Sequence, residues 1–290
     1  ANAFGQWLSA FARMYAATGD KAVLAKLEHL LTEWGKTLGD DGYGFYSNRC
    51  GGPHYTYEKL VCGLVDCYVY AGLDEAKPLL GKLTDWAAAN LDRTRNAASP
   101  TNCVGTAPFE ESGDFIGEWY TLSENLYRAY LATGEAKYKE FADLWRYDAF
   151  WKKLAADDIH AFKGLHAYSH INSLSSAAMS HEVTGDGMYL DAMRNGYDIL
   201  SSHHMLACGL AGPNEIFTSA ENGALAESLK QDKAAFEGPC NVWAGFKLSR
   251  YLMTMTGDAR YGDWAESLTY NTMLACMPMK DDKVRRGNTD

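Results

Sequence analysis

A four-residue phrase recurs along this chain, and each copy separates two amphipathic segments. The phrase consists of a small or apolar residue, Thr, Gly and an acidic residue; its copies begin at Ala17, Ala132, Val183 and Met255, with a weaker copy at Tyr70. Gly ends a helix readily because it adopts the left-handed backbone conformation, and Asp or Glu favours the start of the next helix. The phrase therefore predicts helical hairpins, repeated about every 50 to 70 residues, in an all-α protein.

The apolar residues around these phrases have helical spacing. In the first hairpin Phe4, Trp7, Leu8 and Phe11 fall on one face of a helix. The expected hairpins cover about residues 4–38, 55–91, 115–154, 165–202 and 242–274, and an irregular segment covers 207–236. The loops between hairpins differ in length and carry Gly, His, Glu and aromatic residues, which favours a closed (α/α)6 toroid over an open solenoid.

These hairpins supply one helical pair fewer than a complete (α/α)6 toroid has, so we expect the toroid to be incomplete at its ends. No Pro-rich, Ser-rich or like-charged linker divides the 290 residues, and the chain opens at Ala1 directly into a predicted helix. We therefore predict a single (α/α)6-type domain over residues 1–290, truncated from a longer protein.

The composition argues against two classes of partner. The net charge is −10 at pH 7, and an acidic surface attracts neither nucleic acid nor an anionic membrane. No apolar run reaches the ~18–20 residues that span a membrane. The seven cysteines are scattered without a CxxC pair, which indicates free thiols or one set of metal ligands rather than a disulfide framework.

Two clusters of polar and aromatic residues stand where helices are expected to begin. The first contains Glu58, which either caps the positive end of its helix or contacts a ligand. The second contains Glu118 and Asn125 on one helical face, with Glu124 pointing elsewhere. This second cluster is either an exposed first turn or a functional group, because carboxylates buried beside Trp and Tyr are costly unless they are hydrogen-bonded or functional.

A third cluster carries histidines. His166 and His170 fall on one helical stripe, with Tyr168 between them in the sequence. Two His spaced i, i+4 can share a metal ion, but no third ligand at matching spacing is evident. The pair is therefore either structural or a contact for a sugar, which Tyr side chains also bind by stacking and hydrogen bonding.

The fourth cluster lies in and after the irregular segment. It contains Glu215, Glu221 and Glu237, and cleavage of a glycosidic bond uses two carboxyl groups that flank the bond. Cys240 stands at the start of a predicted helix. It is either a thiolate stabilised by the helix terminus or a buried small hydrophobic residue.

At these four clusters the chain resembles the β-L-arabinofuranosidase-type glycoside hydrolases, family 127 and its close relatives. The family phrase Tyr-Thr-x-His-Lys-x-x-x-Gly-Leu-x-Asp is similar to residues 55–66, and Glu118 and Glu124 keep the two acids of Glu-x-Gly-Gly-x-x-Glu. His166 begins a segment that is similar to His-Ala-Asn-x-Gln, and residues 237–241 look like Glu-x-Cys-Asn. The resemblance follows the family order over most of the chain.

The resemblance implies an (α/α)6 catalytic domain and a retaining hydrolase whose cysteine nucleophile is bound to zinc. In such enzymes three cysteines and one glutamate hold the zinc, and a separate upstream glutamate is the acid/base. By position Glu221 maps to the acid/base, and Glu237 and Cys240 map to two of the zinc ligands. Zinc coordination deprotonates a thiol, which makes a cysteine nucleophile chemically intelligible.

The chain departs from the family at several positions. Glu58 replaces the His of the first phrase, and Tyr168 and His170 replace the Asn and Gln of the third. One residue is inserted between Glu237 and Cys240, and the paired cysteines that follow in the family, including the nucleophile, do not occur. Either the chain ends before them or this chemistry is lost. The arabinose specificity therefore does not carry over, and a uronic or otherwise modified sugar is an open alternative.

We predict a glycoside hydrolase that removes a terminal, β-L-arabinofuranoside-like sugar from an oligosaccharide or polysaccharide. Glu221 is the predicted acid/base, zinc the predicted metal, and the predicted sugar contacts are Glu58, Glu118, His166, Tyr168 and His170. One alternative is another (α/α)6 carbohydrate enzyme, such as a lyase, an inverting hydrolase or an epimerase, which uses carboxylates or a His/Tyr pair and needs no thiolate. The other alternative is a non-catalytic glycan-binding toroid.

Overall fold

The computed structural model describes residues 2–44, 53–91, 118–219, 221–230 and 238–274. Within these ranges the regular structure is helical, apart from two isolated bridges that pair His166 with Ile216 and Met205 with Ala211. The prediction of an all-α chain built of helical hairpins is therefore confirmed. None of the helices in the described ranges is both long enough and apolar enough to cross a membrane.

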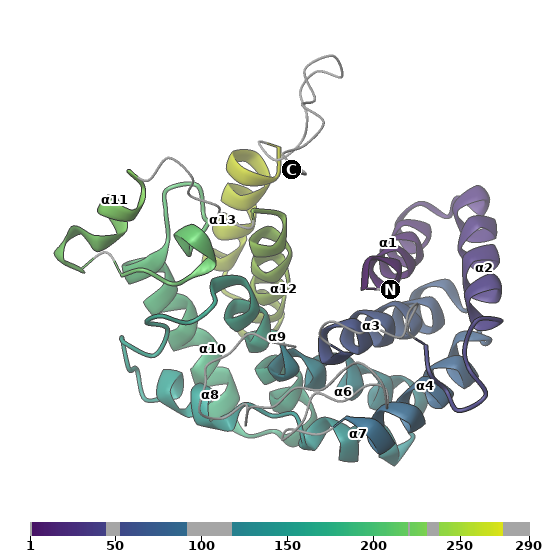
Figure 1. Ribbon diagram of the computed structural model, residues 1–290. Coiled ribbons are helices and arrows are strands. Elements are labelled where there is room, and N and C mark those ends of the chain that lie inside the picture. Colours follow the sequence, from purple (N-terminus) through teal and green to yellow (C-terminus); the bar gives the residue numbers. More distant parts are fainter. Residues whose placement is uncertain (1, 45–52, 92–117, 220, 231–237, 275–290) are drawn as a thin grey trace. The chain divides into compact units, whose positions relative to one another are not determined.

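The chain divides into two compact units, Ala1–Arg146 and Tyr147–Asp290. Both units are built of helices (Figure 1). The prediction of one domain over residues 1–290 stays a prediction.

Unit 1 consists of helical pairs. Its elements are α1 (Asn2–Thr18), α2 (Lys21–Gly35), α3 (Pro53–Ala71), α4 (Ala76–Asn90), the 3-10 turn η1 (Trp119–Thr121), α6 (Leu122–Thr133) and α7 (Ala136–Asp143). The closest approach is between α1 and α3. A Cβ atom at Gly5 would overlap the backbone of Lys59, and one at Gly63 would overlap the backbone of Gly5. The two glycines therefore let the helices touch backbone to backbone.

Unit 2 contains longer irregular stretches. Its elements are α8 (Asp148–Ala155), α9 (Ala167–Thr184), α10 (Gly187–Ile199), the π-helical turn η2 (Leu200–His204), the 3-10 turns η3 (Pro213–Glu215) and η4 (Glu221–Gly223), α11 (Ala224–Ser228), α12 (Gly238–Thr256), α13 (Arg260–Ser267) and the π-helical turn η5 (Leu268–Met273). The third predicted hairpin is only partly correct. Its second arm is two helices, α7 and α8, because the chain leaves the helix after Asp143 and re-enters one at Asp148.

The recurring phrase ends one helix and starts the next, as predicted. Gly185 adopts a left-handed conformation (φ 72°), and the side chain of Asp186 accepts a hydrogen bond of 2.9 Å from the backbone N–H of Met188. Thr184 explains the remaining position of the phrase. Its hydroxyl donates to the carbonyl of Ser180 at 2.6 Å and accepts from the N–H of Asp186 at 3.2 Å, so it binds both sides of the turn.

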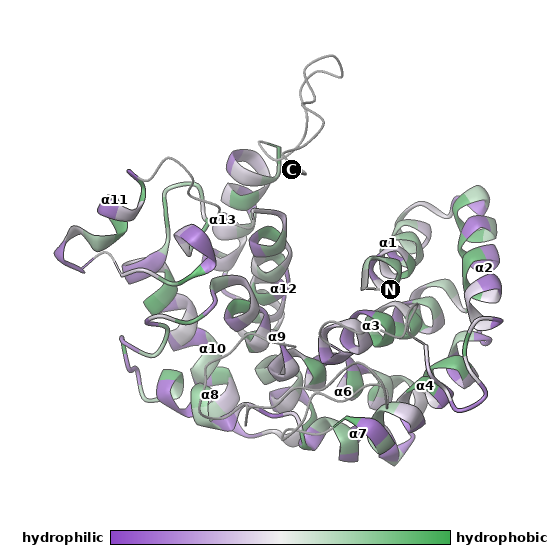
Figure 2. Cartoon of the chain, in the orientation of Figure 1, coloured by the Kyte–Doolittle hydropathy of each residue, from purple (hydrophilic) through white to green (hydrophobic). Residues whose placement is uncertain are grey.

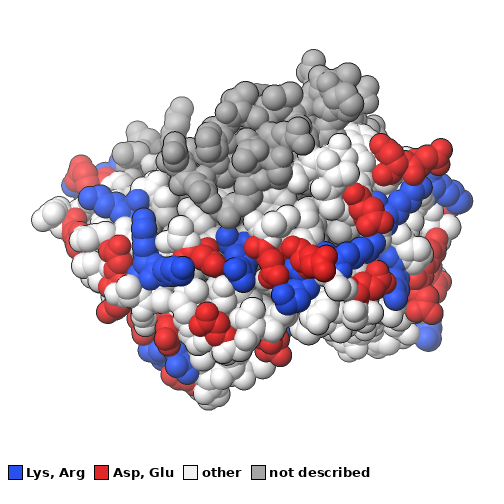
Figure 3. All heavy atoms as spheres, turned by 90° about the horizontal axis from the view of Figure 1, so that it is seen from below, with Lys and Arg blue, Asp and Glu red and all other residues white. Residues whose placement is uncertain are grey.

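The helices are amphipathic, with hydrophobic and hydrophilic residues along each of them (Figure 2). The residues buried in unit 1 include Leu8, Leu27, Leu60 and Leu64. On the face shown in Figure 3, acidic and basic side chains are interspersed rather than gathered by sign. Among the described residues of that face there is therefore no broad basic patch of the kind that binds nucleic acid.

Candidate functional site

In unit 1, Glu58 lies in the second turn of α3 and is 1% exposed. Its Oε2 atom forms an ion pair of 2.7 Å with Nζ of Lys59, which lies 4.6 Å from the centre of the Tyr55 ring. Burial alone would lower the pKa of Lys59, but the charges of Glu58 and Glu118 outweigh burial and raise that pKa. The first turn of α3 contains no acidic residue, so the capping interpretation of Glu58 is wrong.

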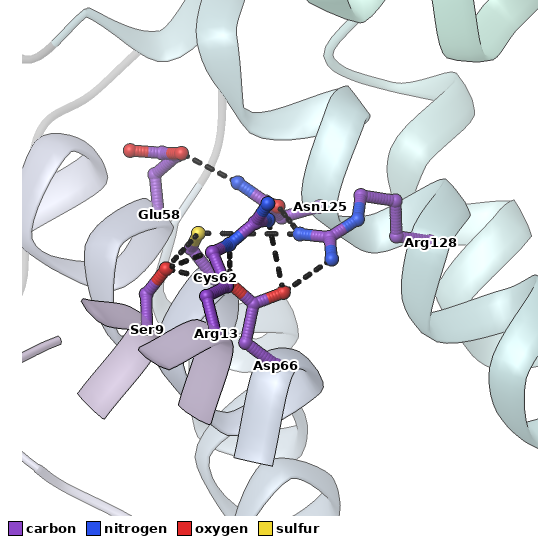
Figure 4. Close-up of polar contacts among 7 residues, drawn as sticks. All are labelled: Ser9, Arg13, Glu58, Cys62, Asp66, Asn125 and Arg128. Carbon is purple, nitrogen blue, oxygen red and sulfur yellow. Dashed lines mark hydrogen bonds and ion pairs between the residues drawn. The ribbon is translucent and has the colours of Figure 1, made fainter. Parts of the chain in front are cut away.

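Glu58 belongs to a hydrogen-bonded network that links three helices (Figure 4). Asn125 on α6 donates from Nδ2 to Oε1 of Glu58 at 2.6 Å, and Arg128 donates from Nη1 to Oδ1 of Asn125 at 2.8 Å. Arg128 also pairs with Asp66 on α3. Asp66 in turn accepts from Nε of Arg13 on α1 at 2.7 Å.

Asp66 carries the charge at the centre of this network. Its side chain is fully buried, and its Oδ2 also accepts from the hydroxyl of Ser9 at 2.6 Å. Burial alone would raise the pKa of Asp66, but Arg128 and Arg13 outweigh burial and hold that pKa below its usual range. Asp66 is therefore ionised at neutral pH and fixes α1, α3 and α6 to one another.

Glu118 and Glu124 are both buried. Glu118 stands before η1 with a left-handed backbone (φ 45°), and its carbonyl accepts from the N–H and the hydroxyl of Thr121 at 3.0 and 2.9 Å. The two glutamates are 7% and 2% exposed, so the interpretation as an exposed first turn is wrong. A residue with positive φ next to buried polar groups is a common feature of functional sites.

In unit 2, His166 and His170 are buried at the start of α9. Nδ1 of His170 lies 2.7 Å from the carbonyl of His166, and burial lowers the pKa of His170 to about 3, so its ring is neutral at pH 7. Nδ1 of His166 lies 2.7 Å from the Ser169 hydroxyl, and its Nε2 lies 3.9 Å from a carboxylate oxygen of Glu215. The predicted sugar contacts His166 and His170 thus lie together.

A metal shared by the two histidines has no support in the described part of the chain. Nowhere in those ranges do three His, Cys, Asp or Glu side chains gather as a metal site would require. The ring of His170 packs instead edge-on against Phe150, with 5.2 Å between ring centres.

Tyr168, the third predicted contact in this region, belongs to a cluster that joins α9 to α12. Its ring centre lies 6.2 Å from that of Trp243. Nζ of Lys247 lies 4.4 Å from the Trp243 ring centre and donates to Oδ1 of Asn172 at 2.8 Å. Aromatic rings with a few polar groups beside them are typical of the lining of small-molecule sites.

The residues predicted for catalysis and zinc binding are only partly described. Glu221 is exposed at the start of η4, and its backbone N–H donates to the Ser219 hydroxyl at 3.1 Å. Cys240 is half-buried in the first turn of α12. Glu237 lies outside the described residues. The roles of all three stay predictions.

Arg13, Arg128 and Lys247 are site residues that the sequence reasoning did not single out. One signal was present for the network: Asp66 follows Glu58 by eight residues, which puts both on one stripe of α3. Nothing comparable pointed to Lys247, because its contact with Asn172 joins residues that are 75 positions apart.

Comparison with known proteins was made by sequence and by structure. The model of the family described as β-L-arabinofuranosidase, GH127 catalytic domain, matches residues 2–285. No curated protein matches the chain.

Similar solved structures include two GH127 enzymes. The GH127 β-arabinofuranosidase BT3674 has a TM-score of 0.65 at 19% identity, covering 92% of this chain and 44% of that one. Ara127N-Se, a GH127 β-L-arabinofuranosidase from Geobacillus stearothermophilus T6, has a TM-score of 0.65 at 17% identity, covering 92% and 45%. The chain thus spans less than half the length of these enzymes. The likeness confirms the predicted fold class, the helical toroid.

A sugar epimerase from a ruminal bacterium is also similar. Its TM-score is 0.58 at 15% identity, and the match covers 92% of this chain and 74% of that one. At such identity the likeness concerns the fold alone.

Proposed function

The chain belongs to the β-L-arabinofuranosidase GH127 catalytic-domain family, and from that premise we propose that the protein is a glycoside hydrolase acting on a terminal, β-L-arabinofuranoside-like sugar of a glycan. The observation that carries this proposal is the family match, which runs over residues 2–285 rather than over one motif. An oligosaccharide or polysaccharide is the partner this activity requires. The net charge of −10 gives no support to a nucleic-acid partner.

Each unit by itself carries groups suited to a hydroxyl-rich ligand. In unit 1 the carboxylates of Glu58 and Glu118 accept hydrogen bonds, and the side chain of Lys59 donates. In unit 2, His166, Tyr168 and their neighbours combine aromatic surface with hydrogen-bonding groups. We therefore keep all the predicted contacts, including His170, as proposed substrate-binding residues.

For the chemistry we propose Glu221 as the acid/base of a retaining mechanism. The acid/base of such an enzyme protonates the leaving-group oxygen and later activates the water that releases the sugar. Glu221 is exposed, so it can exchange protons with solvent between these two steps. The alternative carboxylate nearby in the sequence, Glu215, lies instead 3.9 Å from His166.

Zinc is the metal that the family implies. Cys240 fits a zinc ligand in type, because cysteine sulfur is one of the ligands that zinc takes in proteins. The described residues place no set of three ligand-type side chains together, and Glu237 lies outside them. We therefore derive no catalytic step through zinc. The proposal that Cys240 binds zinc is tested by the metal content of the full-length protein, purified without added metal. Zinc that is bound in the wild type and lost in Cys240→Ala would support this proposal.

Hydrolysis of two arabinofuranosides tests the proposal. The full-length protein should release the sugar from an aryl β-L-arabinofuranoside and from a β-L-arabinofuranosyl disaccharide, and proton NMR at early times should show the β anomer as first product. Glu221→Gln should slow cleavage of the disaccharide by about 100-fold or more, and cleavage of the aryl glycoside less, because a good leaving group needs less protonation.

The matched control is Glu227→Gln. Glu227 is an exposed glutamate of α11 whose only described ion pair is with Lys230 at 2.6 Å. The Glu227→Gln variant should cleave both substrates at the wild-type rate. An α anomer as first product would overturn the retaining mechanism, and equal rates for the two variants would remove Glu221 from the acid/base role.

A second candidate function is sugar epimerisation. The observation that favours it is a His/Tyr pair in unit 2 of the kind that such an enzyme can use. Such an enzyme would use His166 and Tyr168, whose ring centres lie 6.0 Å apart. Its activity would survive Cys240→Ala and a chelator, and in D2O it would incorporate deuterium at the epimerised carbon of a free sugar.

A further inference from the structure

Asn172 combines full burial with an unused hydrogen-bonding group. Its side chain lies on α9 with no solvent exposure, and its Oδ1 accepts from Nζ of Lys247 at 2.8 Å. Its Nδ2 atom is buried and has no hydrogen-bond partner. A buried amide N–H without an acceptor destabilises the fold, so a ligand or a water molecule is the expected explanation for one.

The surroundings of Asn172 identify the chemistry of such a ligand. Two helices each present an aromatic and a polar residue at i, i+4 spacing: Tyr168 and Asn172 on α9, and Trp243 and Lys247 on α12. The aromatic pair meets at 6.2 Å between ring centres, and the polar pair meets at 2.8 Å. Trp243 and Lys247 are half-buried, so this pair is reached from solvent.

The polar groups here are donors. The amide nitrogen of Asn172 and the ammonium group of Lys247 both carry N–H donors. The amide oxygen of Asn172 already accepts a hydrogen bond from Lys247. A molecule that fits must therefore bring oxygen acceptors and a ring face that packs on an aromatic side chain. Sugars have both.

We propose that Asn172, Lys247, Tyr168 and Trp243 form a sugar-recognition site in unit 2, in which Asn172 Nδ2 and Lys247 Nζ donate to oxygens of the sugar. This inference rests on the proposed function for the identity of the ligand, and it adds Asn172, Lys247 and Trp243 to the predicted contacts. The acceptor oxygens belong either to hydroxyl groups of a neutral sugar or to the carboxylate of a uronic sugar. Lys247 carries a positive charge, so a carboxylate should bind more tightly.

The alternative explanation is that the Asn172–Lys247 contact only fastens α9 to α12. Asn172→Asp separates the two explanations, because the carboxylate keeps an acceptor for Lys247 and loses the amide donor. A purely structural contact predicts that this variant binds sugar like the wild type and is at least as stable. The recognition site predicts wild-type stability together with weaker sugar binding.

The experiment titrates the full-length protein with a β-L-arabinofuranosyl disaccharide and, separately, with a uronic disaccharide. Binding is measured by NMR or by calorimetry. Asn172→Asp should weaken binding of the preferred sugar by about tenfold or more, since one hydrogen bond to a ligand is worth about 1.4 kcal/mol. Lys247→Met should weaken binding of the uronic sugar more than binding of the neutral sugar. The control is Arg250→Met on the same helix, whose guanidinium lies 4.2 Å from the ring centre of Tyr251; it should not affect binding.

The outcomes distinguish this inference from the proposed function. If neither sugar binding nor hydrolysis changes in Asn172→Asp while the wild type hydrolyses arabinofuranosides, the site is overturned and the hydrolase stands. If the wild type binds sugar through Asn172 but cleaves no arabinofuranoside, the site stands and the hydrolase fails. If the folded wild type binds neither sugar, the site is overturned.

Discussion

The charged network of unit 1 and helix α9 of unit 2 both bury polar side chains, but they satisfy them differently. In unit 1 the carboxylate of Asp66 is paired with two arginines, and that of Glu58 is held by Lys59 and Asn125. In α9 the buried polar side chains are neutral, and those of Asn172 and Ser175 keep atoms without partners. Buried charge must be compensated within the protein, whereas a neutral donor can be left for a ligand.

A buried polar residue is therefore not evidence of function by itself. Asp66 is fully buried and ionised, yet each of its described contacts holds one helix to another. Asn172 carries no charge and makes a single described contact through its oxygen. We therefore expect changes at Asp66 and its two arginines to act mainly on stability, and changes on this part of α9 to act on binding.

The largest expected effect is that of Asp66→Asn. This substitution leaves Arg13 and Arg128 without their shared carboxylate, and breaking a buried ion pair costs about 3–5 kcal/mol. Urea unfolding, with hydrogen exchange in α3 and α6 to locate the change, measures the loss.

The control for this experiment is Asp198→Asn. Asp198 pairs with Arg260 at 3.0 Å, but both side chains are nearly half exposed, and such a pair is worth about 1 kcal/mol or less. Equal losses in the two variants would contradict the assignment of the unit 1 network to structure.

The pH dependence should separate the two units. The folded-state pKa of His170 is lowered to about 3 by burial, so the unfolded chain binds a proton below about pH 6.5 that the folded chain rejects. Stability from this group is present above pH 6.5 and is lost as the pH falls toward 3; between pH 7 and 5 the loss is about 2 kcal/mol. The lowered pKa of Asp66 acts only at more acidic pH, below about 4.

Hydrogen exchange of α9 at pH 7 and pH 5, corrected for the intrinsic exchange rate, measures this effect. His170→Gln removes the titrating ring and should flatten the change in α9, while α3 should change little in either protein over this range. Burial also lowers the pKa of His204. His204 therefore adds a further loss of stability at acidic pH, and this loss remains in the His170→Gln variant. An unchanged pH response in the variant would show that His170 is not the source.

Much of the fold could be predicted from the sequence because its signals are local. The phrase around Gly185 contains the helix end, the turn and the next cap within a few residues, so its meaning does not depend on the rest of the chain. The break between α7 and α8 was not predicted, since Trp145 is apolar and fits the helical pattern although it lies in a turn buried within unit 1.

The sites could be predicted only in part. Glu58 and His170 stand in recognisable phrases, but their surroundings come from distant residues: Asn125 lies 67 positions from Glu58. Of the two alternatives for Glu118, the exposed first turn is wrong for the same reason, because burial is decided by tertiary packing and not by the residue's own helix. The residue types were enough to identify candidates. Whether a buried carboxylate is structural or contacts a ligand depends on its partners, which the structure shows.

The smallest expected effect concerns the recurring phrase, which both units share. In unit 2 the Asp186 side chain caps α10, whereas in unit 1 the Glu135 side chain makes no cap hydrogen bond to α7. Asp186→Ala should therefore cost about 1 kcal/mol, the usual price of a lost N-cap. Glu135→Ala should cost about 0.5 kcal/mol or less, since its ion pair with Lys77 is exposed. Thermal unfolding of the two variants measures the difference, and hydrogen exchange at the starts of α10 and α7 locates it. If the two substitutions cost the same, the acidic residue at these two positions acts through its charge at the helix terminus rather than through the side-chain cap.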